Sequence, residues 1–404
     1  MLYARTFAIV LALTGAAFAD GHGVVFVNCT KGASLQMAVA GADPGTTLKV
    51  VGACKGPITI TTDGLNLQGG NSASISAANT NVVTVNGATG ITLNGFTIGG
   101  GNNGVIVENN SSVSLQSTTI SGDALIGLQL LGNSSATIHQ FSSTNNGLFG
   151  IDVEASSSLI VVGSNTVQGS GVFGIQINNG SSISLTGANL QVTGNTLGIQ
   201  IGTNAAGFLD GTSVLNTSNN FADGITIVSG SHVVNFGGTI TSNANGIHGI
   251  SLNSKAGLDM DAGSQVTVNL NGADGMHLER ESSMTIFNNP TFSGNPGTTT
   301  LTSQNNQNTG INVQTNSGLL VSNYAALQVL GNGQAGVALD DGSSLSFTQT
   351  IQVNGVQTNI TGNHPDLLLT FGSRLSLLAN DTIGPAHCDA TVLTRGPNAP
   401  VCPQ

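Results

Sequence analysis

The sequence predicts an all-β protein, a single-stranded parallel β-helix of about thirteen coils with three short strands per coil. The first observation is a phrase that recurs about every 24 residues from Gly104 onward: glycine, a large apolar residue, a variable residue and another apolar residue. It occurs as GVIV, GLQL, GIDV, GIQI, GITI, GISL and GMHL. The second is that no helical period lies inside a unit this short, which has room for three strands and three turns.

The third observation is the alternation within the phrase. Its two apolar residues are two positions apart, so both face the same side of a strand, and the residue between them faces the other way. Those intervening residues are polar in most units: Gln129, Asp152, Gln176, Gln200, Thr226, Ser251, His277 and Asn312. Stacking the units at about 4.8 Å per coil gives a rod on the order of 60 Å long.

The chain divides into four parts. Residues 1–19 have the pattern of a secretory signal peptide, with Arg5, an apolar run and Ala17-Phe18-Ala19 before Asp20. The alternative of a membrane anchor is disfavoured because the apolar run is short. We expect residues 20–56 to form an N-terminal cap of strand, short helix and strand, the helix covering the open end of the solenoid. Residues 57–380 hold the repeats, and we expect residues 381–404 to fold over the C-terminal end.

Two irregular features stand out within the repeats. Serine pairs recur at one turn of the coil, and we expect them to form stacked hydrogen-bond ladders: 111–112, 134–135, 181–182, 282–283 and 343–344. An extra loop within Asn288–Asn308 lengthens one unit and is expected to wall a cleft beside the neighbouring coil.

The four cysteines form two local pairs without metal-ligand spacing, which predicts the disulfides Cys29–Cys54 and Cys388–Cys402 in an exported protein. Four free thiols are the alternative.

The charge balance restricts the partners. The net charge is −11, or −12 without Arg5, and only 7% of the residues are charged. No basic patch is present to meet phosphates, which argues against nucleic acid, and few cations are available to hold a polyanionic sugar. No stretch after residue 19 is apolar enough to predict a transmembrane anchor. We therefore expect a secreted protein, extracellular or periplasmic.

The N-terminal order C…SLQ.AV…PGTTLKV.G.C.G.ITI resembles the start of secreted proteins of the pectate-lyase-like superfamily, and the resemblance runs through the repeats to about residue 380. It implies a right-handed β-helix. The superfamily contains lyases, hydrolases, epimerases, phage tailspikes and adhesins, so the resemblance implies a fold more than an activity.

Candidate catalytic residues come from one column of the solenoid. The residue before each repeat glycine changes from apolar to Asp223, His248 and Asp274 over three consecutive units. Two carboxylates flanking an imidazole support general acid–base chemistry. His277 and Glu279 follow nearby as weaker candidates. The alternative is that these are polar turn residues on a solvated edge.

Two segments are similar to those of polygalacturonase-type glycoside hydrolases: FADG at Asp223 resembles their Asn-Thr-Asp-Gly segment, and IHG at His248 resembles their Gly-His-Gly segment. The resemblance implies that Asp223 acts as acid or base and that His248 orients or tunes it.

The function is less defined than the fold. We expect a protein that binds or processes an extracellular polysaccharide, and the alternative is a non-catalytic adhesin-like or matrix protein. No cofactor is predicted, but two carboxylate pairs, Asp152 with Glu154 and Asp259 with Asp261, have the oxygen ligands that Ca²⁺ prefers. Phe149 and Phe173 stack in adjacent units, and we expect packing rather than a sugar platform.

Overall fold

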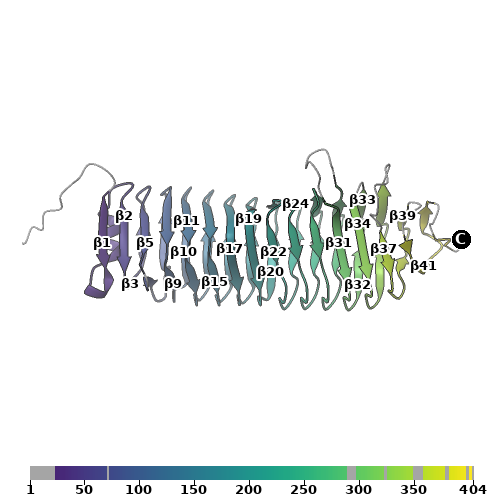
Figure 1. Ribbon diagram of the computed structural model, residues 1–404, viewed down its shortest axis with the longest axis horizontal. Helices are drawn as coiled ribbons and strands as arrows, with labels where there is room; N and C mark the ends of the chain where they lie inside the picture. Colours follow the sequence, from purple (N-terminus) through teal and green to yellow (C-terminus); the bar gives the residue numbers. More distant parts are fainter. Residues whose placement is uncertain are drawn as a thin grey trace, which may run out of the picture.

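The protein is a rod of stacked coils, with the N-terminal coils at one end and the C-terminal coils at the other (Figure 1). The structure, a computed structural model, describes residues 23–70, 72–288, 297–322, 325–348, 358–377, 382–396 and 400–402. The expected signal peptide and the middle of the long loop lie outside the described residues. Every strand pairing in the described part is parallel, and each pairs a strand with its counterpart one coil away.

The strands form a 28-stranded and a 14-stranded sheet, as counted over the described residues. The larger sheet consists of two ladders that merge at β17 and β19. Its first ladder contains β1 (Val24–Asn28), β2 (Thr47–Val51), β5 (Asn66–Gly69), β8 (Ile91–Asn94), β11 (Ser112–Gln116), β14 (Ser135–His139), β17 (Ser158–Gln168), β19 (Ser182–Thr193), β21 (Ala206–Leu209), β24 (His232–Phe236), β27 (Gly257–Asp261), β30 (Ser283–Ile286), β33 (Gly318–Ser322), β36 (Ser344–Thr348), β39 (Arg374–Ser376) and β42 (Leu393–Arg395). Its second ladder contains β17, β19 and β3 (Ala53–Lys55), β6 (Ser74–Ser76), β9 (Thr97–Gly99), β12 (Thr119–Ser121), β15 (Ser142–Thr144), β22 (Val214–Asn216), β25 (Thr239–Thr241), β28 (Gln265–Thr267), β31 (Thr299–Gln304), β34 (Ala325–Leu330), β37 (Asn359–Thr361) and β40 (Thr382–Ile383).

The 14-stranded sheet is built from the recurring phrase. It contains β4 (Ile58–Ile60), β7 (Val83–Asn86), β10 (Asn103–Glu108), β13 (Ile126–Leu130), β16 (Phe149–Val153), β18 (Phe173–Ile177), β20 (Leu197–Ile201), β23 (Ile225–Val228), β26 (Ile250–Asn253), β29 (Met276–Glu279), β32 (Thr309–Val313), β35 (Ala335–Leu339), β38 (Leu367–Leu369) and β41 (Ala386–Cys388). The apolar residues of the phrase are buried in one continuous core, as the alternation predicts.

The glycine of the phrase is required by a close approach between coils. A Cβ atom on Gly150 would lie 2.7 Å from the carbonyl oxygen of Gly174, and one on Gly174 would lie 2.7 Å from that of Gly198. Real Cβ atoms do not approach a carbonyl that closely, so any larger residue would push two coils apart. Each glycine thereby fixes the corner at which the chain enters the 14-stranded sheet.

Side-chain ladders stabilise the turns of the coil. The predicted serine ladder is present, because the Ser134 hydroxyl accepts the Ser111 N–H at 3.1 Å and the Ser157 hydroxyl accepts the Ser134 N–H at 3.2 Å. A second ladder was not predicted. Buried asparagines accept, through Oδ1, the backbone N–H of their counterpart in the preceding coil: Asn195, Asn220, Asn245, Asn271, Asn306, Asn332 and Asn363.

The N-terminal end contains the expected capping helix. The 3₁₀ turn η1 (Cys29–Lys31) and helix α1 (Leu35–Ala40) follow β1, and Ser34 caps the N-terminus of α1 by accepting the Met37 N–H with its hydroxyl. The Gln36 side chain accepts the Thr59 N–H at 2.6 Å and donates to the Thr59 carbonyl at 3.4 Å. Its amide thus replaces a missing strand at the edge of β4, which keeps that edge from recruiting another chain.

The C-terminal end differs from the expectation. Residues 382–395 do not leave the coil but continue it, because β40, β41 and β42 pair in parallel with β37, β38 and β39. The period is hidden from the sequence because Asp366 and Pro385 occupy the position that holds the phrase glycine in earlier coils. The predicted disulfides Cys29–Cys54 and Cys388–Cys402 close one loop near each end. Neither helix of the described part is long and apolar enough to cross a membrane.

The two ends of the long loop are described, but its middle is not. Its described ends, Asn288 and Gly297, follow β30 and precede β31, between the two ladders of the larger sheet. The candidate column precedes strands of the 14-stranded sheet instead. Residues 289–296 lie outside the described part, so the expected cleft wall stays a prediction.

Candidate functional site

The outer face of the 14-stranded sheet presents three columns of side chains, which we call the first, second and third columns. The second and third columns alternate with the buried apolar residues, and the first is defined by register as the residue before the glycine of each phrase. The first contains Phe149, Phe173, Leu197, Asp223, His248, Asp274 and Thr309. The second contains Asp152, Gln176, Gln200, Thr226, Ser251, His277 and Asn312. The third contains Glu154, Asn178, Gly202, Val228, Asn253, Glu279 and Gln314.

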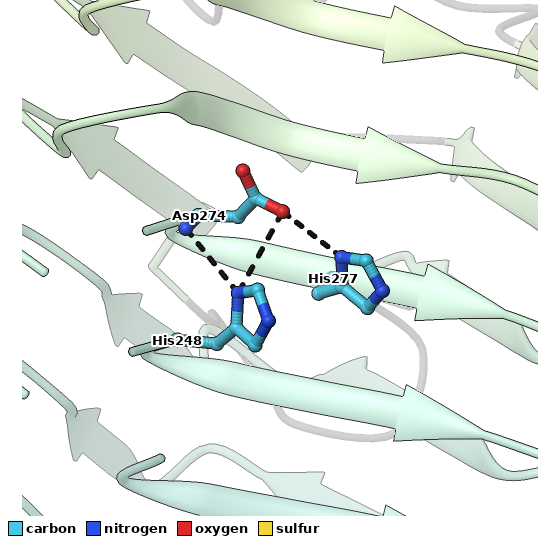
Figure 2. Close-up of side chains that lie close together, drawn as sticks. All are labelled: His248, Asp274 and His277. Carbon is cyan, nitrogen blue, oxygen red and sulfur yellow. Dashed lines mark hydrogen bonds and ion pairs between the residues drawn. The ribbon is translucent and has the colours of Figure 1, made fainter. Parts of the chain in front are cut away.

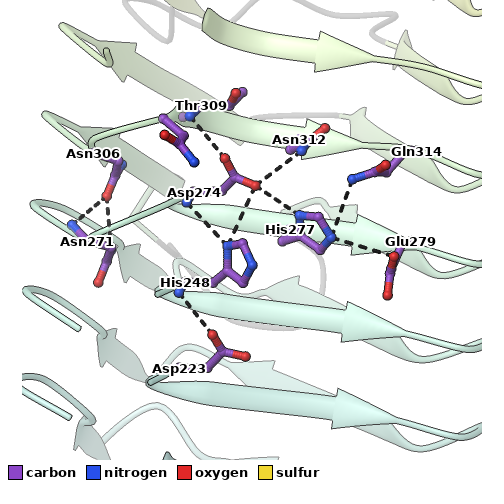
Figure 3. A network of polar contacts seen from close by, with 12 residues as sticks. Asp223, His248, Asn271, Asp274, His277, Glu279, Asn306, Thr309, Asn312 and Gln314 are labelled. Atoms are coloured by element: carbon purple, nitrogen blue, oxygen red, sulfur yellow. Dashed lines mark hydrogen bonds and ion pairs between the residues drawn. The ribbon is translucent and has the colours of Figure 1, made fainter. Parts of the chain in front are cut away.

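The three predicted residues of the first column bind successive coils together. Asp223 Oδ1 accepts the His248 N–H at 2.9 Å, and His248 Nδ1 accepts the Asp274 N–H at 3.2 Å. Asp274 Oδ1 then accepts the Thr309 N–H at 3.0 Å (Figure 3). One side-chain atom of each residue therefore accepts a backbone N–H of the next coil. This is the structural role expected of polar residues at a turn.

The second carboxylate oxygen of Asp274, Oδ2, contacts side chains rather than the backbone. Oδ2 lies 2.9 Å from Nδ1 of His277 and 3.6 Å from Nδ1 of His248, so one carboxylate faces two imidazoles (Figure 2). Oδ2 also accepts the amide of Asn312 at 3.1 Å. The Asp274 side chain is only 6% exposed, and His277 is 14% exposed. A buried carboxylate that fixes the Nδ1 of a partly exposed histidine leaves Nε2 of that ring to exchange a proton.

The two histidines stack with ring centroids 4.5 Å apart and an interplanar angle of 22°. Burial lowers the pKa of His248 below its ordinary value; the charge of Asp223 opposes this, and His277 reinforces it. Because His248 Nδ1 accepts a backbone N–H, the neutral ring carries its proton on Nε2. His248 is therefore suited to donate a hydrogen bond from Nε2.

The pKa of His277 moves in the opposite direction. Burial alone would lower it, but the hydrogen bond and the charge of Asp274, with the charges of Glu279 and Asp223, raise the pKa above its ordinary value. Burial would likewise raise the pKa of Asp274, but the bonds from His277, Thr309 and Asn312 hold it below its usual range. The geometry thus favours a protonated His277 beside an ionised Asp274.

The third column borders the free side of His277. Glu279 Oε2 lies 3.8 Å from His277 Nε2, and Gln314 Nε2 lies 3.5 Å from the same atom (Figure 3). Asn253 donates to Glu279 Oε1 and accepts from Arg280 at 3.3 Å, and Arg280 lies 3.9 Å from Glu279. These residues form a polar rim that positions a carboxylate near the exchangeable proton.

His248, Asp274 and His277 are also spaced as metal ligands, since one donor atom of each lies within 4.8 Å of the others. Some of these donor atoms already take part in hydrogen bonds: His248 Nδ1 accepts a backbone N–H, and Asp274 Oδ2 contacts His277 and accepts from Asn312. A metal ion bound through these atoms would have to displace those hydrogen bonds.

The two carboxylate pairs considered for Ca²⁺ lie elsewhere. Asp152 is buried in the second column with Oδ2 bonded to Gln129, and Glu154 follows it in the third. Asp259 lies on β27 of the larger sheet, 3.1 Å from His232 Nε2, and Asp261 on the same strand is buried. Whether either pair binds Ca²⁺ stays a prediction.

The structure brings all five predicted site residues together, but their placement favours different residues as catalytic candidates than the sequence did. His277, a weaker candidate in the sequence, has the better-placed ring, and Asp223 touches the others only through the His248 backbone. The sequence did not single out Asn312, Thr309 or Gln314. Asn312 was recognisable, because it follows His277 by one unit in the outward polar position; Thr309 acts through its backbone, which no side-chain pattern reveals.

Residues 58–197 match a family model described as a right handed β-helix region. The chain is a right-handed parallel β-helix. The fold that the sequence resemblance to the pectate-lyase-like superfamily predicted is thereby confirmed. No curated protein gave a significant match to the sequence.

Solved structures of the same fold are similar at low identity. The enzymatically active domain of tailspike protein 2 from bacteriophage CBA120 is 15% identical with a TM-score of 0.50, over 65% of this chain and 47% of that one. The chain thus spans less than half the length of that tailspike domain. A periplasmic alginate epimerase is 13% identical with a TM-score of 0.49, over 80% and 82% of the two chains. A pectate lyase is 15% identical with a TM-score of 0.42, over 81% and 77%. Such likenesses concern the fold alone.

Proposed function

We propose that this protein is an exported β-helix protein that cleaves glycosidic bonds of an extracellular polysaccharide by acid–base catalysis. The observation that supports it is the contact of 2.9 Å between buried Asp274 and His277 on a solvent-facing sheet. His277 is the proposed catalytic residue, and Asp274 is its positioning residue. Two disulfides suit an oxidising compartment outside the cytoplasm.

The proposed step is hydrolysis. Nε2 of protonated His277 gives its proton to the glycosidic oxygen as the bond from that oxygen to the anomeric carbon breaks. A water oxygen forms the new bond to the anomeric carbon, and the proton of the water passes to the carboxylate of Asp223. Asp223 stands two coils from His277, about 9.6 Å along the rod, which is slightly more than the roughly 6.5–9.5 Å between the two carboxyl groups of an inverting pair.

A second candidate is a non-catalytic surface or matrix protein. It is favoured by the first column, in which Asp223, His248 and Asp274 each hold a backbone N–H of the neighbouring coil. In that case the polar groups would only stabilise the stacking of the coils, and the outer face would bind glycans or other chains without reaction.

The test is an activity panel of neutral and acidic polysaccharides, scored for new reducing ends and for unsaturated products. His277→Gln is compared with His232→Gln. His232 is a matched control because it also contacts an aspartate, Asp259 at 3.1 Å, but on the larger sheet, and it is 47% exposed.

Hydrolysis that falls about 100-fold or more in His277→Gln and not in His232→Gln supports the proposal. Equal activity in both variants would place the reaction elsewhere on the rod. Absence of activity on every polymer, with the protein folded, would favour the non-catalytic candidate.

A further inference from the structure

The outer face of the 14-stranded sheet carries an aromatic pair upstream of the ionisable residues. Phe149 on β16 and Phe173 on β18 are neighbours in register, with ring centroids 5.4 Å apart and an interplanar angle of 26°. Both side chains are only partly buried, so part of each ring faces solvent. Phe173 precedes His277 by four coils, or about 19 Å along the rod. The pair thus lies on the same track as the proposed catalytic residue.

Two hydrogen-bond acceptors in the same two coils have no partner within the described part of the protein. They are Asp152 Oδ1 in the second column and Asn178 Oδ1 in the third, in adjacent coils. Asp152 is 2% exposed, and its other oxygen accepts the Gln129 amide at 3.0 Å. An unpaired buried acceptor costs stability, which a ligand that brings a donor would recover.

The second column continues as an amide row. Gln176 donates to Gln200 Oε1 at 2.8 Å. Each amide has both donor and acceptor atoms, so the row can also form hydrogen bonds with the hydroxyl groups of a sugar. Apolar rings beside amides and carboxylates are the usual lining of a site for a ligand with one apolar face and a polar edge.

The charges on this face limit which sugars fit. From Phe149 to Gln314 the three columns contain the carboxylates Asp152, Glu154, Asp223, Asp274 and Glu279 and, among these described residues, neither Lys nor Arg. The nearest cation along the chain, Arg280, is 64% exposed and turned to Glu279. The carboxylate of a uronate would be repelled by these carboxylates. It would also offer no hydrogen-bond donor to the unpaired oxygens of Asp152 and Asn178.

We propose that the outer face from Phe149 to Gln200 is a binding subsite for an uncharged polysaccharide, whose pyranose rings stack on Phe149 and Phe173 and whose hydroxyls donate to Asp152 and Asn178. This rests on the proposed function, for which it names the substrate class. It differs from the expectation that the two phenylalanines serve packing rather than a sugar platform. Because β-elimination needs a carboxylate or carboxyl ester next to the C5 hydrogen of the sugar, a polymer without uronic acid units is consistent with hydrolysis and not with a lyase.

The test measures binding by calorimetry with the His277→Gln protein, so that no substrate is consumed. Neutral polymers (a glucan, a galactomannan and an arabinoxylan) are compared with polygalacturonate and alginate. The main variant adds Phe149→Leu with Phe173→Leu, which keeps an apolar side chain but removes the aromatic faces. Leucine is tolerated there, because Leu197 occupies the same column in the next coil. Phe208→Ala is the matched control, since Phe208 is 40% exposed on β21 of the larger sheet.

Binding of at least one neutral polymer, weakened about tenfold or more by the leucine pair and unchanged by Phe208→Ala, is the expected result. Equal or tighter binding of a uronate polymer overturns the substrate class, and equal binding by the leucine pair overturns the platform. Failure of all five polymers to bind overturns the subsite. None of these binding outcomes depends on catalysis. Full hydrolytic activity of His277→Gln would contradict the proposed function without changing the binding result.

Discussion

The carboxylate of Asp274 holds His277 by a contact of 2.9 Å between Oδ2 and Nδ1, and both residues belong to the same coil, three positions apart. The carboxylate is itself fixed from the next coil, where Thr309 donates at 3.0 Å and Asn312 at 3.1 Å. A ring held through Nδ1 in this way keeps one tautomer and one orientation. The stacking of coils therefore supplies the rigidity that an acid–base residue needs.

The first prediction concerns the pH dependence of hydrolysis. As an acid, His277 must be protonated, so kcat/KM should fall as the pH rises through its pKa, which lies above the ordinary 6.5. Asp274→Asn removes the charge that raises this pKa, so the alkaline limb should move to lower pH, with kcat reduced about 100-fold. The measurement is a pH profile of kcat/KM for both proteins.

Asp259→Asn is the matched control, because Asp259 contacts His232 on the other sheet. Its profile should superimpose on that of the unaltered protein. An alkaline limb that stays in place in Asp274→Asn would show that His277 is not the titrating acid.

The second prediction is that the two stacked histidines titrate in opposite directions from 6.5. Nuclear magnetic resonance of the ring protons should give a pKa below 6.5 for His248 and above 6.5 for His277. Replacing His277 with Gln should raise the pKa of His248, because the positive charge of His277 contributes to lowering it.

The same pKa of His277 has a consequence for stability. Because its folded value exceeds 6.5, protonated His277 stabilises the fold below pH 6.5, and this contribution is lost as the pH rises through the folded pKa. Urea unfolding at pH 5.5 and pH 8.5 should show His277→Gln more destabilising at the lower pH. A larger loss at pH 8.5 would contradict the assignment.

The third prediction concerns metals. Since the donor atoms of His248 and Asp274 already serve hydrogen bonds, treatment with a chelator should leave the activity and the melting temperature unchanged. Added Zn²⁺ should inhibit, because binding to His277 and Asp274 would displace the proton that the reaction needs. Loss of activity on chelation, restored by Zn²⁺ or Ca²⁺, would instead show a metal centre at or near these residues.

The sequence predicted the coil and the column, but not which side-chain atoms of the column contact the backbone and which contact other side chains. The glycine phrase fixes register, so Asp223, His248 and Asp274 had to lie in successive coils. Which oxygen of Asp274 meets a backbone and which meets His277 depends on rotamers and on the next coil, which periodicity does not encode. The asparagine ladder was missed for a related reason: its residues lie at a corner, outside any strand alternation.

The fourth prediction uses this ladder. Asp123 occupies its N-terminal end, where Oδ1 accepts the Gly101 N–H at 3.0 Å, but Oδ2 is buried without a partner among the described residues. At the equivalent atom, Asn306 carries an Nδ2 that donates to the Val268 carbonyl at 3.0 Å. Burial raises the pKa of Asp123 to about 6, well above the ordinary 3.8. An asparagine at position 123 would supply the donor that the ladder uses elsewhere.

Asp123→Asn should therefore raise the free energy of unfolding by about 1 kcal/mol above pH 6, a figure reduced for solvent screening of the carboxylate. The ionised carboxylate is what destabilises the fold, so the gain should shrink as the pH falls through 6 and vanish below 3.8. The reverse change, Asn306→Asp, should cost about 3 kcal/mol at neutral pH, because it removes donors to Val268, Ser303 and Asn332. Urea unfolding at pH 4 and pH 8 measures both. A gain from Asp123→Asn that is as large at pH 4 as at pH 8 would show that the charge of Asp123 is not its cause.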